Sequence, residues 1–429
     1  MRIEKINLSF FNAGDVVNTT NGPRESGFIS SMEKHYIAPE MKTFYDKTLI
    51  TLAGANLVHE QFGQKRPIPK NGGKTIEFRK FSKLPKALRP ITEGVTPSGK
   101  KLCVSSVSCT VDQYGDYIEQ TDMLELTAID NTIVEATKEL ASQAGLTLDT
   151  VVRNELIGGT NVMYVPCSDG KNDIAVTSRS DITSGCRLRV KDVFKAAAEL
   201  KAVNAPKING SYVAIIHPYV AYDLMQDAGE QWIGIQKYAD PENILKGEIG
   251  MLGGVRFVES TEAKIISPDE IIEGFNRLTL VSDVNTSTTL IPINEDLMER
   301  DFANPLPVFV GGEENTITGV QISENNICVK LGKPVSSLKA GDVISGRGAG
   351  RNGDAVFCTL FLGENAYGVT DIEGGGLEHI VKQRGYGNDP LNQRSSVGWK
   401  ATKVAKRLLE EYILRVESAS EFSATAEAN

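Results

Sequence analysis

A long amphipathic helix is the feature that most constrains this chain. Residues 130–157, DNTIVEATKELASQAGLTLDTVVRNELI, repeat apolar side chains at intervals of three and four, which places them on one helix face. About thirty helical residues span about 45 Å, and such a helix with a narrow apolar stripe is typical of a flat domain. Gly145 lies inside the run and weakens the case for a straight helix. The stripe consists of Ile133, Ala136, Leu140, Ala144, Leu148, Val151 and Val152.

A basic hairpin is predicted before this helix. Residues 63–110 alternate in polarity and are interrupted by Pro and Gly, which is typical of a long β-hairpin. Between Lys65 and Lys101 there are eleven basic residues and two acidic ones, Glu77 and Glu93, although the whole chain carries a net charge of -9. This imbalance favours an acidic partner surface. A solvated strand face remains an equal alternative.

The rest of the chain alternates helices and strands. Helices are predicted within 31–60 and over 190–205, and a buried strand followed by a helix over 211–225, with Pro218 in the first helical turn. Residues 265–355 carry short alternating runs separated by turn signals, the pattern of a small β barrel or sandwich. The segment 398–418 is interpreted as strands, although helical spacing competes there.

Composition excludes several classes of protein. A net charge of -9 argues against a protein that coats itself with nucleic acid. No window reaches the roughly 18 apolar residues of a membrane span, and the N-terminus lacks a signal peptide, so we expect a protein that is made in a cytoplasm and stays there. No two cysteines have C-x-x-C spacing, and all six are expected to be buried thiols. They are Cys103, Cys109, Cys167, Cys186, Cys328 and Cys358.

The sequence contains no recognisable set of catalytic residues. The match Gly348-x-Gly350-x-x-Gly353 is followed by the strand-like VFCTLFL and not by a helix, so a hairpin loop is favoured over nucleotide binding. The four histidines never form a close pair, and His217 lacks a nucleophile motif, which leaves a hydrolase as a distant option.

Two further motifs have structural explanations. His379 follows Glu378 on a predicted strand, so the two point to opposite faces. Asp116, Glu119 and Asp122 (GDYIEQTD) favour helix capping over a cation site. We therefore expect no enzyme, no cofactor and no metal, and the long helix, hairpin and basic segment instead suggest assembly.

Five stretches resemble the major capsid proteins of tailed bacteriophages, in the branch typified by coliphage N4. The last two are the most specific, and the likeness covers most of the chain outside 265–355. The stretches are QYGDYIEQTDMLEL (113–126), YVAIIHPYVAYDL (212–224), GEIGMLGGVRFVES (247–260), GENAYGVTDIEGGGLEHIVKQ (363–383) and DPLNQRSSVGWKA (389–401).

The resemblance implies an α+β chain with the Hong Kong 97 capsid fold and a β-rich insertion. Its parts are expected to be an N-terminal arm (1–30), a helical segment of the peripheral domain (31–62), an extended loop (63–110), the peripheral domain with its spine helix (111–187), the axial domain (188–264 and 356–395), the insertion (265–355), return strands of the peripheral domain (396–420) and a tail (421–429).

The implied function is that of a structural subunit of an icosahedral or prolate viral shell, located in the virion. It is expected to assemble with itself into pentamers and hexamers, with scaffolding and portal proteins as partners, in the host bacterial cytoplasm. The shell would enclose double-stranded DNA and contact it weakly and non-specifically. No membrane partner is expected. An encapsulin-like compartment that encloses enzyme cargo is the alternative.

Two sets of site residues follow from this reading. The extended loop is expected to contact a neighbouring subunit through Phe78, Arg79, Lys80, Phe81, Lys83, Leu84, Lys86 and Arg89. Gly374, Gly375 and Gly376 of GGGLEH are expected to form a bend of the axial domain, because glycine supplies backbone freedom there. Relatives with this fold can join a loop lysine to a neighbour's asparagine; we expect no such cross-link at Lys83 or Lys86, because no residue stands out as the buried acid that it needs.

Overall fold

The computed structural model describes most of the chain from residue 57 onward. No helix within the described ranges is long and apolar enough to cross a membrane. The described residues are 57–81, 84, 86–88, 90–91, 93–94, 96, 99–127, 132–168, 173–229, 248–272, 275–295, 297, 305–311, 313–323, 326–382, 391–423 and 426–429.

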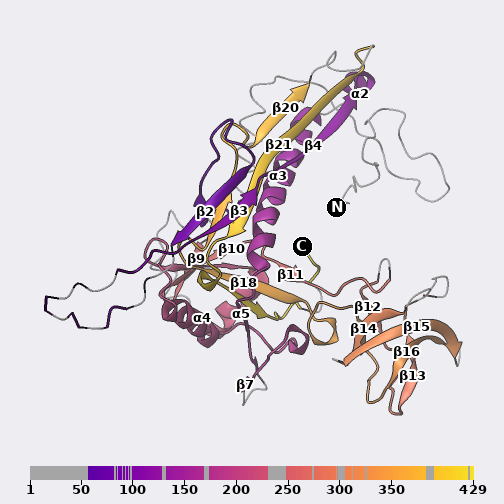
Figure 1. The fold of residues 1–429 in the computed structure, drawn as a ribbon. Helices are drawn as coiled ribbons and strands as arrows, with labels where there is room; N and C mark the ends of the chain where they lie inside the picture. The colour runs from indigo at the N-terminus through magenta and orange to yellow at the C-terminus, as the bar shows by residue number, and fades with distance from the viewer. Residues whose placement is uncertain are drawn as a thin grey trace. The chain divides into compact units, whose positions relative to one another are not determined.

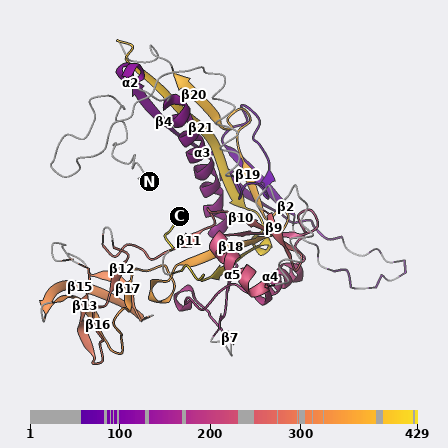
Figure 2. The same ribbon diagram turned by 180° about the vertical axis from the view of Figure 1, so that it is seen from behind.

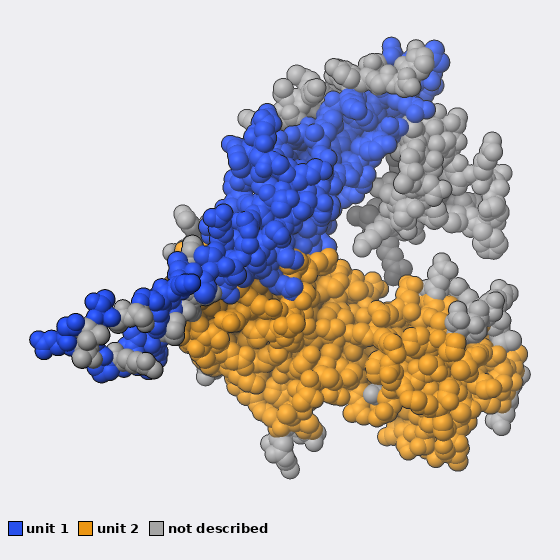
Figure 3. Space-filling view, viewed as in Figure 1, with its two compact units in different colours: residues 1–152, 367–408 blue, residues 153–366, 409–429 orange. Residues whose placement is uncertain are grey.

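The chain divides into two compact units, coloured separately in Figure 3. Unit 1 comprises the residues up to 152 together with 367–408, and unit 2 comprises 153–366 together with 409–429. The expected N-terminal arm (1–30) and the first helical segment, up to residue 56, lie outside the described residues.

Unit 1 is organised around one long strand, β21 (Figure 1). One half of β21 pairs with β4 and β20, and its other half pairs with β19, which is followed by β1 in the sheet. All of these pairings are antiparallel except that of β1 with β19. The elements of unit 1 are β1 (Gln64–Lys65), β2 (Thr75–Phe81), β3 (Val104–Thr110), β4 (Asp112–Thr121), α2 (Asp122–Thr127), most of α3 (Thr132–Ile157), β19 (Tyr367–Thr370), β20 (Glu378–Lys382) and β21 (Arg394–Arg407).

Helix α3 confirms the long helix predicted from the sequence. Its apolar stripe packs against β21, and both ribbon views show the helix running alongside β4 and β21 (Figures 1 and 2). The helix contributes Leu140, Ala141, Ala144 and Leu148 to this core, and β21 contributes Val397, Trp399 and Ala401.

The predicted hairpin is also present. Strands β2 and β3 pair antiparallel over their full length, from Thr75 opposite Thr110 to Phe81 opposite Val104. Strand β4 begins two residues after β3 ends, so the hairpin is continuous with the sheet that packs on α3.

Unit 2 contains a seven-stranded mixed sheet in the order β5-β22-β18-β8-β10-β9, with β11 also paired to β18. Strands β8 and β18 are buried at every residue, as expected for strands covered on both faces. The strands are β5 (Val162–Tyr164), β8 (Tyr212–Ile216), β9 (Glu248–Leu252), β10 (Val255–Glu259), β11 (Ile265–Ile266), β18 (Val356–Leu362) and β22 (Ile413–Ser418).

Two predicted helices accompany this sheet, α4 (Val190–Ala202) and α5 (Pro218–Ala228). Each buries one apolar face, with Val193 and Leu200 from α4 and Val220 and Leu224 from α5. The remaining short elements are β6 (Cys167–Ser168), β7 (Asp173–Ile174), η1 (Arg179–Asp181), η2 (Arg351–Gly353) and η3 (Glu410–Tyr412).

The β-rich segment predicted over 265–355 contains a closed barrel. Six antiparallel strands follow the order β12-β17-β14-β15-β16-β13. The bridge between Leu280 and Ile293 joins the two outer strands, and an apolar core fills the interior. The strands are β12 (Arg277–Thr279), β13 (Thr288–Ile293), β14 (Leu306–Val310), β15 (Glu313–Ser323), β16 (Asn326–Val335) and β17 (Val343–Ser345).

The division into units differs from the expected domains in three places. Residues 153–187, expected in the peripheral domain, lie in unit 2, where β5 pairs with β22. Strands β19 and β20, expected in the axial domain with residues 188–264, lie in unit 1 with α3. Strand β22, expected among the return strands of the peripheral domain, lies in unit 2 because it pairs with β18 and β5.

Candidate assembly surface

The hairpin presents charged and apolar side chains to solvent. Arg79, Lys80 and Lys86 are exposed. Leu84 is 56% exposed, Leu88 82% and Ile91 75%. Exposure of large apolar side chains is unfavourable, because their removal from water lowers the free energy. Lys83 and Arg89 lie outside the described residues. The hairpin therefore carries a mixed basic and apolar surface.

Phe78 differs from the other expected contact residues. Its side chain is only 4% exposed. A Cβ atom added to Gly368 would lie 2.6 Å from the ring Cζ, so the ring packs directly on the backbone of β19. Phe78 therefore anchors the hairpin to its own unit and is not exposed for a neighbour. Phe81 is the last residue of β2.

Leu88 and Ile91 were not among the expected contact residues, yet they are the most exposed large apolar side chains of the described part of the hairpin. Both lie in KALRPITEG (86–94), where apolar residues stand singly among charged residues and proline. In such a segment with no regular period, exposure cannot be deduced from spacing.

The three glycines of GGGLEH form a turn between β19 and β20. Gly374 has a φ of 80°, which favours glycine. The Gly375 carbonyl accepts hydrogen bonds from the Thr402 N–H at 2.9 Å and the Thr402 hydroxyl at 2.6 Å. This bend lies in unit 1 and leads the chain from β19 into β20. Its hydrogen bonds are with its own backbone and with β21.

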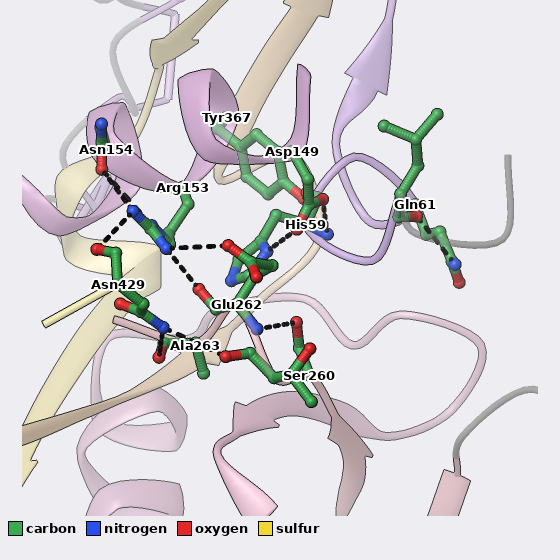
Figure 4. A network of polar contacts seen from close by, with 12 residues as sticks. His59, Gln61, Asp149, Arg153, Asn154, Ser260, Glu262, Ala263, Tyr367 and Asn429 are labelled. Carbon is green, nitrogen blue, oxygen red and sulfur yellow. Dashed lines mark hydrogen bonds and ion pairs between the residues drawn. The ribbon is translucent and has the colours of Figure 1, made fainter. Parts of the chain in front are cut away.

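A buried polar network fastens the start of the described chain to unit 1 (Figure 4). His59 and Asp149 are both fully buried. The Asp149 carboxylate accepts from the His59 N–H at 2.8 Å and lies 2.6 Å from His59 Nδ1, and the Tyr367 hydroxyl donates to the His59 carbonyl. Burial raises the pKa of Tyr367, so its hydroxyl stays protonated as this bond requires.

The next residue adds a second anchor. Glu60 lies 2.7 Å from Lys403 on β21 and 3.2 Å from Lys65 on β1. Burial alone would raise the pKa of Glu60, but the charges and hydrogen bonds of Lys403 and Lys65 outweigh it and hold the pKa below its ordinary value. His59 and Glu60 thus fix the chain between α3 and the sheet.

The expected tail, 421–429, is held within unit 2. The Asn429 side chain donates to the carbonyls of Thr261 and Ala263 and accepts from the Ile265 N–H. Its carbonyl accepts from Arg153, whose side chain is 2% exposed (Figure 4). These bonds hold Asn429 against β11 and the residues before it.

The histidines considered for catalysis have structural surroundings. His217 Nδ1 accepts the Tyr219 N–H at 3.2 Å and caps α5, and burial lowers the pKa of His217 to about 4. Glu378, beside His379 on β20, lies 3.0 Å from Lys400. The described contacts of His217 are therefore those of a helix cap.

The acidic motif GDYIEQTD spans the junction of β4 and α2, as predicted. Asp122 begins α2, and its carboxylate accepts the Met123 N–H at 2.8 Å. Asp116 accepts from Gln143 of α3 at 2.7 Å. Within the described ranges, no three His, Cys, Asp or Glu residues gather closely enough to hold a metal ion.

The cysteine expectation needs a correction. Cys167 and Cys186 form a disulfide, and Cys103 is exposed, whereas all six were expected to be buried thiols. The pairing arises because β6 lies beside the turn that contains Thr183, which contacts both sulfurs. Cys109, Cys328 and Cys358 are buried and free, and burial raises the pKa of Cys358 to about 12.

The glycine motif at 348–353 is a loop, as predicted. It contains the short helix η2 and leads into strand β18. The Arg351 N–H donates to the Ile182 carbonyl at 2.7 Å, so the loop docks on its own unit.

Comparisons with known proteins agree with a structural role. Residues 133–272, which run from α3 to beyond β11, match a family described as phage capsid protein. A search of curated proteins found no match.

Solved capsids share the fold. The capsid protein of Ralstonia phage GP4 is 10% identical with a TM-score of 0.53, and the match covers 97% of this chain and 98% of that chain. The capsid protein of cyanophage Pam1 is 12% identical with a TM-score of 0.50, covering 96% of this chain and 100% of that one. The chain has a capsid-like fold with mixed sheets and few helices, and the matching family is one of structural proteins rather than enzymes.

Proposed function

We propose that this chain is the repeating subunit of a bacteriophage shell, of the Hong Kong 97 type and the coliphage N4-like branch. The main support is the capsid-like fold along 97% of the chain. The family match over α3, α4, β8 and α5 adds an independent sequence argument.

The exposed surface of the hairpin supplies a candidate contact between subunits. Leu84, Leu88 and Ile91 remain in water although apolar burial drives association. Basic side chains surround them in a chain whose net charge is -9. A surface of this kind is completed when it lies over the acidic surface of a neighbouring subunit.

Repeated contacts between different surfaces close into rings and shells. We propose pentamers and hexamers of one closed shell that encloses double-stranded DNA with weak, non-specific contacts. Scaffolding and portal proteins would take part in assembly in the host bacterial cytoplasm, and the product would be the virion.

The barrel is proposed to be a surface insertion on the outer face of the shell. Its entry and exit strands, β11 and β18, pair directly with each other. Insertions are tolerated where the chain enters and leaves at neighbouring points. Bracing of capsomers and attachment to a host surface are both compatible with this position.

Covalent cross-linking of subunits is not part of the proposal. Lys86 is exposed, whereas joining a lysine to an asparagine needs a buried acid to take up the lysine proton. Mature particles should therefore separate into single chains on a denaturing gel, and ladders of covalent multimers would contradict this.

Sedimentation velocity tests assembly directly. Purified protein, alone and with its scaffolding protein, should form species far larger than one 46.6 kDa chain. A protein that stays monomeric under every assembly condition would contradict the proposal. The ratio of nucleic-acid to protein ultraviolet absorbance, measured on particles from infected cells, distinguishes a DNA-filled shell from an encapsulin-like compartment filled with protein.

A further inference from the structure

The disulfide of unit 2 closes a segment of the chain onto the main sheet. Cys167 lies in β6, opposite Ile174 of β7, and the Cys186 carbonyl accepts the Ala419 N–H at 2.9 Å, directly after β22. Cys167 is partly exposed, whereas Cys186 is fully buried. We call residues 173–186, which lie between the two cysteines, the tethered segment.

The tethered segment supports the loop through which the chain leaves the barrel. The Ile182 carbonyl accepts the Arg351 N–H at 2.7 Å. The Ser184 N–H donates to the Asp354 carboxylate at 3.0 Å. Both partners lie between β17, the last strand of the barrel, and β18. A Cβ atom added to Gly350 would lie 2.6 Å from the Ile182 carbonyl oxygen, so the loop backbone rests directly on the tethered segment.

The disulfide also shares an apolar core with the two strands that connect the barrel. Cys186 belongs to a buried cluster with Val356 of β18, and Cys167 and Ile266 of β11 pack against the same cluster. Ile266 and Val356 are register partners where the chain enters and leaves the barrel. The disulfide is therefore part of the base on which the barrel is mounted.

A second attachment holds the tethered segment independently of the cysteines. Arg179 donates from Nε and Nη2 to the two carboxylate oxygens of Glu417, each at 2.7 Å. Glu417 lies on β22 and is fully buried. Charge-assisted pairs of this bidentate kind are strong. Opening of the disulfide should therefore loosen the part of the segment around residues 182–184 without detaching it.

The surroundings of the two sulfurs suit reversible thiol–disulfide exchange. The Thr183 N–H donates to Cys186 Sγ at 3.1 Å, and donation of this kind stabilises a thiolate. An external thiolate that attacks Cys167 Sγ, in the partly exposed residue, would form a mixed disulfide and release Cys186 as the thiolate. A second external thiol then releases Cys167, so the protein disulfide is reduced to two thiols and two small thiols are oxidised to one small disulfide. Closure is the reverse, with a small disulfide as the oxidant.

We propose that Cys167 and Cys186 form a thiol–disulfide exchange site that clamps the base of the barrel. The clamp is open, as two thiols, in a reducing cytoplasm, and it closes when the particle reaches oxidising surroundings. Only this timing rests on the proposed function. The effect of the clamp on the barrel base is a property of the single chain.

Hydrogen exchange of the purified full chain, with and without dithiothreitol, tests the effect. The two cysteines are 19 residues apart, and a cross-link of this span restricts the open states through which the enclosed amides exchange. Peptides that contain Ser184 and Arg351 should exchange about tenfold faster after reduction. A peptide from the buried strand β8 is the control and should not change. Equal exchange in the oxidised and reduced chain would overturn the clamp.

A double variant assigns the effect to these two sulfurs. Cys167→Ser with Cys186→Ser should exchange like the reduced wild type, with or without dithiothreitol. Cys103→Ser, which removes an exposed free thiol, is the matched control and should keep the full response. A response of the double variant to dithiothreitol would overturn the assignment. The comparison of oxidised and reduced wild type stays decisive if the double variant does not fold.

Thiol trapping tests the timing. N-ethylmaleimide is added to infected cells and, separately, to released particles, and the labelled cysteines are identified by mass spectrometry. Both Cys167 and Cys186 should be labelled in cells and neither in released particles. A disulfide already closed in cells, or thiols still free after release, would overturn the timing. A chain that shows the redox-dependent exchange but never forms shells would contradict the proposed function and leave the clamp in place.

Discussion

Ile266 and Val356 are register partners in the antiparallel pairing of β11 with β18, although the entire barrel lies between them in the chain. A second backbone contact brings the entering and leaving chain segments together closer to the barrel, because the Asp269 N–H donates to the Arg347 carbonyl at 2.7 Å. The barrel is therefore joined to the rest of unit 2 through two adjacent strands.

Removal of the barrel should leave the remaining fold intact. In the variant, residues 270–345 are deleted and Asp269 is joined to Gly346 by Gly-Ser, which keeps the loop that docks on Ile182. We expect a cooperative thermal transition and shells of reduced stability. Circular dichroism measures the thermal transition, and electron microscopy shows whether shells form. Residues 270–345 expressed alone should also fold, because the barrel has its own core. Loss of all shell formation would show that the barrel is integral.

The contact between Phe78 and Gly368 should limit substitution at the glycine. Gly368→Ala places a methyl group 2.6 Å from the ring, and overpacking of this kind lowers the free energy of unfolding by about 1–3 kcal/mol. Gly376→Ala is the control, since nothing lies within 4 Å of its added Cβ, and it should change stability by less than about 0.5 kcal/mol. Urea unfolding measures both. Phe78→Leu should partly rescue Gly368→Ala, and a lack of coupling would contradict the contact.

His217 should make stability depend on pH. Its folded pKa of about 4 lies below the ordinary value of 6.5, so between these values the unfolded chain binds the proton more readily. Stability from this group is present above pH 6.5 and decreases as the pH falls toward 4. Asparagine also caps helices but does not titrate.

The comparison is therefore between the wild type and His217→Asn, by thermal or urea unfolding from pH 7 to pH 4.5. The wild type should lose about 1–2 kcal/mol more than the variant. Asp223, whose pKa burial raises, acts in the opposite direction but is present in both proteins. Parallel pH profiles would contradict the role of His217 as a neutral cap.

Reversal of hairpin charge should weaken assembly. We expect Arg79→Glu, Lys80→Glu and Lys86→Glu together to raise the concentration for half-maximal assembly about tenfold at low salt. The loss should shrink as salt screens the charges. The control reverses three exposed lysines of the barrel segment, Lys330, Lys333 and Lys339. Light scattering at several salt concentrations measures both, and unchanged yield and salt sensitivity would contradict the acidic partner surface.

Local pattern was sufficient to predict several elements. The three- and four-residue spacing predicted α3, and Pro218 after a buried strand predicted the start of α5. Alternation predicted β2, β3 and the strands of the barrel. In each case, the signal lies within the element itself.

Long-range pairing could not be predicted in the same way. The alternation of β2 leaves open which face is buried, and Phe78 faces inward only because β19, almost 300 residues later, lies beneath it. His59 and Asp149 are 90 residues apart, and no local pattern links them. The disulfide of Cys167 with Cys186 likewise depends on how two turns meet.

Cryo-electron microscopy of assembled particles tests the central claim most directly. Particles formed by the purified chain with its scaffolding protein should be closed shells, with pentamers and hexamers built from one subunit. Density for residues 84–91 of each subunit should lie on its neighbour, and the barrel should stand on the outer surface. A soluble oligomer without a closed shell, from a chain that folds normally, would contradict the account.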